Sequence, residues 1–345
     1  MEIVSVGEHS VCRHYRSFVP IEGLAELGHR TAVCAAAGRG LPRELDDPPE
    51  LARADVILGY RMLFNNVRAI RREIARGAAF VWDTDDDLAN LPRDSATFKA
   101  IGQSRVAELV QRTAQLARLA DVVTTTTTQL ARKYQRLGVR RVVVIPNYLS
   151  SGAVRPPRVP QTRDEVTIGW VAGGEHRVDA KKVPVVKALR RLLAAHPNVR
   201  VESAGVALPL PAERYRHYEW VEIARLPDLC ARWDIGLAPL SDIPFNRARS
   251  DVKLKEYAAV GLPWLASPVG PYKEMGETEG GQLIPDYGWY DALERLFTDP
   301  AERAVLSARA SAWAATQSID GNARLWESVC EEALRRRRSR AGAVG

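Results

Sequence analysis

Polar residues that could bind phosphate and hydroxyl groups gather between residues 246 and 256. They are Asn246, Arg249, Ser250, Asp251, Lys253 and Glu256. Cations can stabilise negative charge on a departing phosphate, and a carboxylate can accept two hydroxyl hydrogens in charge-assisted bonds. Ser250 and Asp251 could cap a helix, whose N-terminus favours an anion. The alternative is an ordinary helix with a solvated glutamate before a Gly-x-Pro turn.

A second candidate site follows a strand predicted over 166–171. Two glycines, Gly173 and Gly174, come after this strand and precede a helix, and such a turn lets backbone N–H groups approach phosphate oxygens. The cations and the imidazole that follow are His176, Arg177, Lys181 and Lys182. Two adjacent glycines are weak evidence alone, and a single histidine is more often structural. The prediction of a site here therefore depends on the first segment.

Clustered carboxylates form a third candidate site, directly after a strand predicted over 78–82. They are Asp83, Asp85, Asp86 and Asp87. Hard cations prefer several oxygen ligands, so one interpretation is a metal site. Another is a polar cluster with an acid/base role toward a second substrate. A third is that Asp87 merely caps a turn.

The chain resembles the glycosyltransferases of the GT-B fold, and within them the large retaining family 4 (glycosyl transferases group 1). The matching core is Lys255-Glu256-Tyr257-Ala258-Ala259-Val260-Gly261-Leu262-Pro263, followed by a strand that ends at Ala266-Ser267. The preceding run, Phe245 to Lys253, is similar to a sub-branch that acts on surface polysaccharides. The resemblance extends in order from Val4 to about Tyr272, although only 234–272 is specific.

The resemblance implies that the second half binds a nucleotide-diphosphate sugar. Glu256 would take the ribose hydroxyls, Arg249 and Lys253 would balance phosphate charge, and the Gly173-Gly174 loop would face the diphosphate. The implied donor-binding set is Gly7, Arg16, Gly173, Gly174, His176, Arg177, Lys182, Asn246, Ser250, Asp251, Lys253 and Glu256. The chain departs from the family at Ala248, where an additional glutamate often stands, so the group that touches the donor sugar is not indicated.

The resemblance also implies an acceptor side in the first half. Tyr15, Arg61, Asp83 and Asp85 would face the acceptor, and Arg61 could pair with the aspartates. Arg16 could contact either donor phosphate or acceptor, or it could be an ordinary helix-face arginine. The implied catalytic groups are Asp85, Asp86, Arg249 and Lys253, with no obligatory metal. Asn147 would shape the hinge that follows the first half.

The elements needed to position these residues alternate between strand and helix, which predicts an α/β protein with parallel sheets. Strands are predicted over 2–6, 30–35, 54–59, 78–82, 121–125, 141–145, 166–171, 199–203, 219–223, 234–238 and 263–266. Helices are predicted over 13–27, 65–76, 98–119, 129–137, 179–195, 252–260 and most of 287–338. Two doubly wound halves would place ligands at the carboxyl ends of their strands.

The proline-rich stretch 150–163 has no helical or strand period and is predicted to be a linker. The predicted organisation is an N-terminal acceptor-side domain over 1–149, this linker, and a nucleotide-sugar domain over 164–317. Residues 318–345 would form a C-terminal helix, which could return to the first domain, and a basic tail. The fold class predicted is therefore GT-B, with two Rossmann-like domains.

Composition excludes several classes of protein. The chain has 345 residues, 46% of them hydrophobic and 26% charged, which is typical of a globular protein. No apolar run approaches the roughly 18 residues of a membrane span, and the N-terminus lacks the pattern of a secretory signal. Four scattered cysteines indicate free thiols in a reducing cytoplasm. The predicted location is cytoplasmic, with a peripheral inner-membrane position as an alternative.

The net charge of +7 is weak evidence for a nucleic-acid partner, because five arginines of the tail, between Arg335 and Arg340, contribute most of it. The favoured function is transfer of a sugar from a UDP- or GDP-linked donor to an acceptor hydroxyl, with retention. The acceptor expected is a cell-surface glycan or glycolipid; modified DNA, a protein or a natural-product aglycone are alternatives. The rival classes are a non-catalytic nucleic-acid- or sugar-binding protein on the same fold, and a nucleotide-sugar epimerase.

Overall fold

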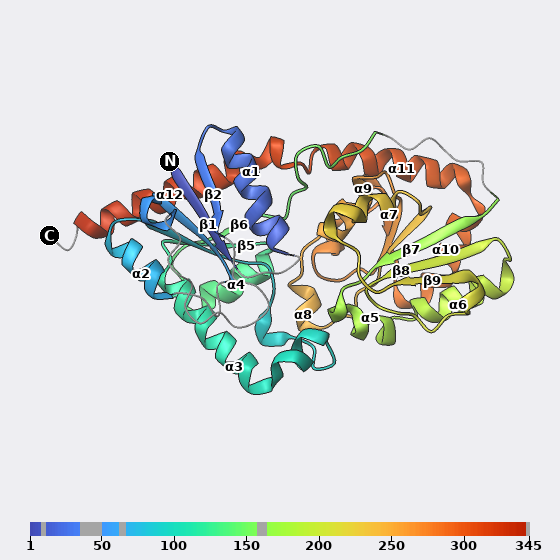
Figure 1. The fold of residues 1–345 in the computed structure, drawn as a ribbon. Coiled ribbons are helices and arrows are strands. Elements are labelled where there is room, and N and C mark those ends of the chain that lie inside the picture. The colour runs from blue at the N-terminus through green and yellow to red at the C-terminus, as the bar shows by residue number, and fades with distance from the viewer. Residues whose placement is uncertain (8–11, 35–49, 62–66, 157–163, 343–345) are drawn as a thin grey trace. The chain divides into compact units, whose positions relative to one another are not determined.

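The computed structural model describes residues 1–7, 12–34, 50–61, 67–156 and 164–342, which form two compact units (Figure 1). Unit 1 comprises Met1–Ala89, Ser104–Ser151 and Ser318–Gly345, and unit 2 comprises Asn90–Gln103 and Gly152–Gln317. Part of the predicted linker, 157–163, lies outside the described residues. The predicted domain boundaries remain a prediction.

Unit 1 contains a six-stranded parallel sheet in the order β2-β1-β3-β4-β5-β6. Its strands are β1 (Glu2–Gly7), β2 (Arg30–Cys34), β3 (Val56–Tyr60), β4 (Ala79–Thr84), β5 (Val122–Thr125) and β6 (Val142–Val144). Most are short runs of buried apolar residues, as expected when helices cover both faces of a parallel sheet. Because all strands run the same way, their carboxyl ends meet at one edge.

Helices cover both faces of this sheet. They are α1 (Val19–Glu26), α2 (Val67–Ala75), α3 (Ala96–Leu119), α4 (Thr128–Arg136) and α12 (Ile319–Gly342), with one π-helical turn over His14–Phe18. Neighbouring strand residues point to opposite faces: Ile3 packs in a core with α1 and α12, whereas Val4 packs in a second core with α2, α3 and α4. The predicted helix over 98–119 is interrupted at Gly102, which has a non-helical φ of 75°.

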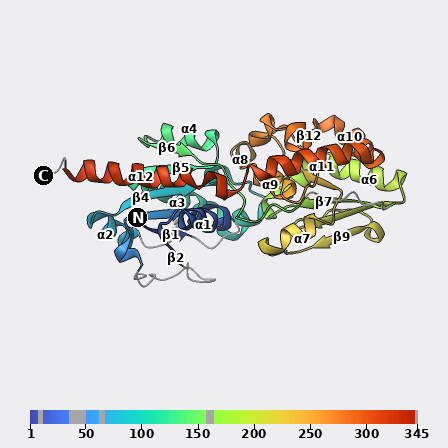
Figure 2. The same cartoon turned by 90° about the horizontal axis from the view of Figure 1, so that it is seen from above.

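The long C-terminal helix α12 belongs to unit 1. It packs against α1 (Figures 1 and 2). The buried ring of Trp326 lies in the same core as Ile3. Its basic end is tied to the buried Asp121: Arg337 donates to Oδ2 at 3.0 and 3.1 Å, and Arg340 donates to Oδ1 at 2.9 Å. Part of the arginine-rich tail therefore has a structural partner within the chain.

Unit 2 contains a second six-stranded parallel sheet, in the order β12-β11-β10-β7-β8-β9. The strands are β7 (Val166–Val171), β8 (Val199–Ala204), β9 (Tyr215–Tyr218), β10 (Ile235–Ala238), β11 (Trp264–Ala266) and β12 (Gly281–Leu283). The helices are α5 (Arg177–Lys182), α6 (Val185–Ala195), α7 (Leu226–Cys230), α8 (Pro244–Arg247), α9 (Val252–Ala258), α10 (Trp289–Thr298) and α11 (Pro300–Ala315). One face packs on α6 and α10, and the other on α7 and α9.

The predicted α/β fold class, with two parallel sheets, is confirmed, but two local predictions in unit 2 are wrong and one strand was missed. The strand predicted over 219–223 lies instead at Tyr215–Tyr218. The single helix predicted over 179–195 is two helices, because Val183 is extended and Pro184 cannot donate a helical hydrogen bond. β12 was not predicted, because its three residues are too short to show a period.

Among the described residues, none of the helices combines the length and apolar character that crossing a bilayer requires. The four cysteines, Cys12, Cys34, Cys230 and Cys330, are free thiols in this structure.

Candidate functional site

The candidate donor site of unit 2 is built on two loops at the carboxyl edge of its sheet. One follows β7 and carries Gly173 and Gly174; the other follows β10 and runs from Pro239 to Asp251. β7 and β10 pair directly, so both loops leave the sheet side by side. Gly205, with a φ of 95°, supports the first loop, because a Cβ there would lie 2.0 Å from the carbonyl oxygen of Ala172. Ligands of open α/β sheets bind at this edge.

A fully buried carboxylate, Asp179, joins these two loops. Its Oδ1 accepts hydrogen bonds from Ser241 N at 2.8 Å, Ser241 Oγ at 2.7 Å and Asn246 Nδ2 at 2.7 Å. Its Oδ2 lies 2.8 Å from Nδ1 of His176. These bonds outweigh burial, which alone would raise the pKa of Asp179, and the pKa is lowered. Asp179 is therefore ionised near neutral pH and is held by uncharged donors.

His176, which was predicted as a donor-binding residue, lies inside unit 2 and packs edge-on against Trp170. Burial lowers the pKa of His176 to about 4, assisted by the positive charge of Arg249, although Asp179 acts in the opposite direction. His176 is thus a neutral imidazole at pH 7. It cannot supply positive charge to a phosphate at that pH.

Arg249 and Glu256 both lie close enough to Lys253 to affect its pKa. Burial lowers the pKa of Lys253, and Arg249 lowers it further, whereas Glu256 raises it. Lys253 and Glu256 sit on α9, one turn apart, so their side chains emerge on neighbouring parts of the helix surface. The structure brings these three predicted residues together beside the loop that Asp179 organises.

The start of α9 differs from the prediction. Asp251 occupies the position before the first helical residue, but its side chain caps no backbone N–H. Instead, its Oδ2 lies 3.1 Å from Nζ of the buried Lys255. The predicted capping hydrogen bond from this residue is therefore wrong. The neighbouring Ser250 is half-buried.

Tyr257 anchors α9 to the sheet. Its hydroxyl accepts from Val171 N at 3.1 Å and donates to the carbonyl of Leu237 at 2.8 Å. These two contacts join the ends of β7 and β10. Glu256 precedes Tyr257, so the position of its backbone is determined by the same anchor.

The other predicted cations of unit 2 are on the surface. Arg177, Lys181 and Lys182 are exposed on α5, and Nζ of Lys181 lies 3.3 Å from Asp94 of the same unit. Glu175, next to the glycines, accepts a hydrogen bond from Thr97. This contact and Arg249 lower the pKa of Glu175 against the opposing effect of burial. Gly173 itself is exposed, so its backbone can be approached from solvent.

The candidate site of unit 1 contains two arginine–aspartate groups, and the first is a buried pair that joins Arg16 to Asp83. Arg16 donates to Asp83 from Nε at 2.9 Å and from Nη2 at 2.5 Å. Its Nη1 donates to Ile145 O at 2.7 Å and to Asn147 Oδ1 at 3.1 Å. Only 1% of Arg16 is exposed. In this structure, Arg16 therefore holds the edge of the sheet together, with Asn147 as one of its acceptors.

The second pair joins Arg61 to Asp85 and Asp86, just beyond the ends of β3 and β4. Arg61 Nη2 donates to Asp85 Oδ1 at 2.7 Å and also to Asp86. The hydroxyl of Tyr60 donates to the same Asp85 oxygen at 3.0 Å. Arg61 has a φ of 54°, which is the left-handed region that non-glycine residues avoid. Such strain is retained where surrounding contacts impose it, often at functional sites.

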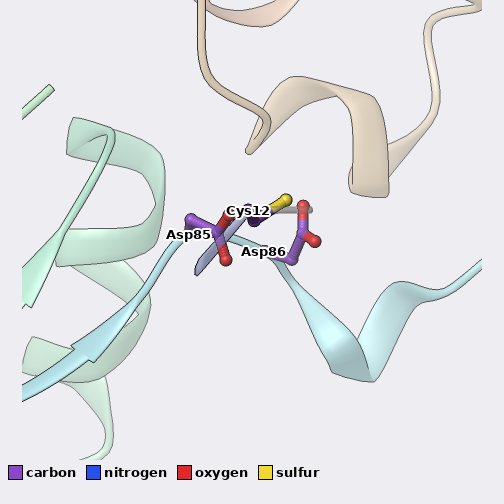
Figure 3. A group of neighbouring side chains, drawn as sticks. All are labelled: Cys12, Asp85 and Asp86. Atoms are coloured by element: carbon purple, nitrogen blue, oxygen red, sulfur yellow. The ribbon is translucent and has the colours of Figure 1, made fainter. Parts of the chain in front are cut away.

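Cys12 completes this cluster, and Figure 3 shows its thiol grouped with the carboxylates of Asp85 and Asp86. The three potential ligand atoms lie within 4.8 Å of one another. Burial raises the pKa of Cys12 well above its usual value, and both aspartates raise it further. Burial alone would raise the pKa of Asp85, but Arg61 lowers it. A divalent ion here would share the two carboxylates with the positive charge of Arg61, which occupies one oxygen of each.

The remaining predicted residues of unit 1 lie around these pairs. Tyr15 and Gly7 are buried, and a Cβ on Gly7 would lie 3.0 Å from Cβ of Tyr60. Asp87 is paired with Lys133 of α4. Asp83 also accepts from Thr124 Oγ1 at 2.5 Å, and burial raises its pKa although Arg16 opposes the change.

The sequence analysis did not identify the role of Asp179. It treated this residue only as the first of the helix predicted over 179–195. The available signal was the His-x-x-Asp spacing, which places the two side chains on one helical turn. The partners Ser241 and Asn246 lie more than 60 residues away, so nothing local indicated them.

No protein-family profile matches the sequence, and neither does any curated protein. Solved structures do match over nearly the whole chain. Sucrose-phosphate synthase from Thermosynechococcus elongatus is 14% identical and has a TM-score of 0.62, over 99% of this chain and 100% of that one. This similarity, with two parallel six-stranded sheets, decides the fold. The chain has the GT-B fold.

Two further GT-B structures show the same similarity. A glycosyltransferase from Rickettsia africae is 12% identical, with a TM-score of 0.65 over 96% of this chain and 98% of that one. HepE from Anabaena, solved in complex with UDP and glucose, is 14% identical, with a TM-score of 0.61 over 95% and 99%.

Proposed function

We propose that the protein is a glycosyltransferase that moves a sugar from a nucleotide-diphosphate donor, UDP-linked in the first instance, to an acceptor hydroxyl. The observation that carries the proposal is the grouping of Arg249, Lys253 and Glu256 at the carboxyl edge of the unit 2 sheet. Positive charge and a carboxylate together suit a ligand with a diphosphate and a ribose. The GT-B fold supports this interpretation, because HepE has been solved with UDP and with UDP-glucose.

In this proposal, unit 2 binds the donor. Glu256 accepts hydrogen bonds from the ribose hydroxyls, and Arg249 and Lys253 stabilise charge on the leaving diphosphate. The backbone of Gly173 and Gly174 contributes N–H donors. Asn246, Ser250 and Asp251 shape the loop after β10. The exposed Arg177 and Lys182 contribute to the positive potential of the donor site.

Unit 1 would bind the acceptor through Arg61, Asp85 and Asp86, with Tyr15, Arg16, Asp83 and Gly7 supporting them from within. Because Arg61 offsets one of the two negative charges and the carboxylates accept hydrogen bonds from hydroxyls, this cluster suits an uncharged, hydroxyl-rich acceptor. We infer a glycan or glycolipid acceptor and no requirement for a divalent metal. Transfer should then persist in EDTA.

We further propose that transfer retains the anomeric configuration. The acceptor oxygen bonds to the anomeric carbon on the face that the diphosphate leaves. The carbon–oxygen bond to the diphosphate breaks with its electron pair going to the diphosphate, and a phosphate oxygen takes the acceptor proton. An inverted anomer in the NMR spectrum of the product would contradict this mechanism.

The first test is a panel of UDP- and GDP-sugars, with released nucleoside diphosphate as the measurement. We expect slow release from at least one UDP-sugar, and faster release when a suitable acceptor is added. A protein that releases no diphosphate and binds no nucleotide in calorimetry would refute the proposal. A product formed without acceptor, with its sugar epimerised, would instead indicate an epimerase.

The second test replaces Glu256 by alanine. Hydrogen bonds to a charged group are worth about 1.5–3 kcal/mol, so we expect affinity for UDP to fall by roughly tenfold to a hundredfold. Glu213→Ala is the matched control, because Glu213 is exposed on the same unit and should leave the affinity unchanged. Wild-type affinity for UDP in the Glu256 variant would refute the ribose contact.

A further inference from the structure

The buried pair His176–Asp179 determines which nitrogen of the imidazole carries hydrogen. Asp179 is ionised, and an ionised carboxylate can only accept hydrogen bonds. The 2.8 Å contact between Asp179 Oδ2 and His176 Nδ1 therefore requires the hydrogen to be on Nδ1. The other carboxylate oxygen is occupied by Ser241 and Asn246, so the carboxylate cannot turn away.

This arrangement leaves Nε2 of His176 as an acceptor. The imidazole is neutral at pH 7, so Nε2 carries a lone pair and no hydrogen. Nε2 makes no hydrogen bond to any residue that the structure describes, although His176 is only 2% exposed. Nε2 is not among the buried unpaired side-chain atoms of the described residues, so it keeps some exposed surface and a donor from outside the chain can reach it.

The charged groups around His176 indicate what kind of ligand supplies that donor. Arg249, from the loop after β10, and Lys253, from α9, both lower the pKa of the imidazole through their charge. These two are the groups proposed to hold the diphosphate. A ligand bound there brings its sugar hydroxyls close to its phosphates, whereas a phosphate oxygen has no hydrogen to donate to Nε2.

We propose that Asp179 is a positioning residue that holds His176 so that Nε2 accepts a hydrogen bond from a hydroxyl of the bound nucleotide sugar. This inference rests on the proposed function and adds to it a contact that recognises the hydroxyl part of the donor, not its charge. The hydroxyl is one of the transferred sugar, so His176 distinguishes a nucleotide sugar from the nucleotide alone.

The variant His176→Asn tests this contact, because the asparagine amide can occupy the place of Nδ1 and still donate to Asp179, but nothing replaces Nε2. UDP and UDP-glucose serve as probes in calorimetry. We expect UDP to bind as tightly as to wild type and UDP-glucose to bind about tenfold more weakly. Unchanged affinity for UDP-glucose, or an equal loss for both compounds, would overturn the proposal.

A second measurement does not depend on activity. In the full chain labelled with ¹⁵N, the His176 resonances should show a protonated Nδ1 and an unprotonated Nε2 from pH 6 to 8, and Asp179→Asn should abolish this fixed state. A protonated Nε2 in wild type would overturn the inference alone. Wild-type protein that binds neither UDP nor UDP-glucose, while keeping the Nδ1–H form, would refute the proposed function and the hydroxyl contact with it.

Discussion

The two units bury carboxylates at the carboxyl edges of their sheets in opposite ways. In unit 1, Asp83 and Asp85 are balanced by the arginines Arg16 and Arg61. In unit 2, Asp179 is held by a serine, an asparagine and a neutral histidine. Unit 1 therefore uses its buried cations internally, whereas the hydrogen bonds to Asp179 require none. This difference fits an uncharged ligand in unit 1 and an anionic one in unit 2.

The largest effect should come from breaking the buried pair of unit 1 with Arg16→Met. Removing one partner of such a pair leaves a buried charge unbalanced and typically costs about 3–5 kcal/mol. Urea unfolding should show this loss of stability. Arg30→Met is the control, because the Arg30 side chain is 78% exposed. A loss below about 1 kcal/mol would mean that burial of Asp83 does not depend on the charge of Arg16. It would contradict the statement that unit 1 balances its buried carboxylates with arginines.

In unit 2, Lys253→Met should affect turnover and not stability. Removing one group that stabilises transition-state charge typically costs about 2.7–4 kcal/mol, or roughly a hundredfold to a thousandfold in rate. The free energy of unfolding should not fall, because burial already disfavours the charged amine. Lys187→Met, at an exposed position of α6, should retain wild-type release of nucleoside diphosphate. A stability loss with unchanged turnover would reverse the roles assigned to the two units.

The neutral histidine of unit 2 should also leave a signature in acid. The pKa of His176 is about 4 in the folded state, below the ordinary value of 6.5, so the unfolded chain binds more protons between these values. Stability should therefore fall as pH drops from 6.5 to 4, by about 3 kcal/mol from this group. His176→Asn should flatten that part of the stability curve. An identical slope in both proteins would show that His176 is not buried as a neutral group.

The smallest effect concerns the strained backbone of Arg61. Both Arg61→Ala and Arg61→Gly remove the guanidinium from Asp85 and Asp86, but only glycine adopts a φ of 54° without cost. The glycine variant should therefore be more stable than the alanine variant, by about 1–2 kcal/mol in thermal or urea unfolding. Equal stabilities would show that the left-handed conformation relaxes once the arginine is gone.

The sequence predicted the strands and helices of this fold better than the contacts between residues that are far apart in the chain. The strand over 166–171 was placed correctly, because a buried parallel strand is a continuous apolar run that is visible locally. The strand near residue 219 was misplaced, because the whole stretch from Tyr215 to Ile223 mixes aromatic and charged residues without a clear end. The break at Pro184 could have been expected from the proline alone.

The residues of the site could be predicted only where they lie close together in the sequence. Arg249, Lys253 and Glu256 are near in sequence and near in space, so their grouping was visible. Arg16 gave no local sign that it would be buried, because its acceptors, Asp83 and Asn147, are separated from it by 67 and 131 residues. Folding brings such residues together through the parallel order of the strands, which local patterns do not encode.

The position of α12 has a consequence for how the chain is made. Ile319 and Trp326 complete the core that begins with Ile3, yet they are synthesised after the whole of unit 2. On the ribosome, unit 2 can therefore reach its native packing first, while the α1 face of unit 1 still exposes apolar surface. The strand β1 precedes unit 2 in the chain but belongs to the unit that is finished last, and chaperone contact during synthesis should concentrate on that face.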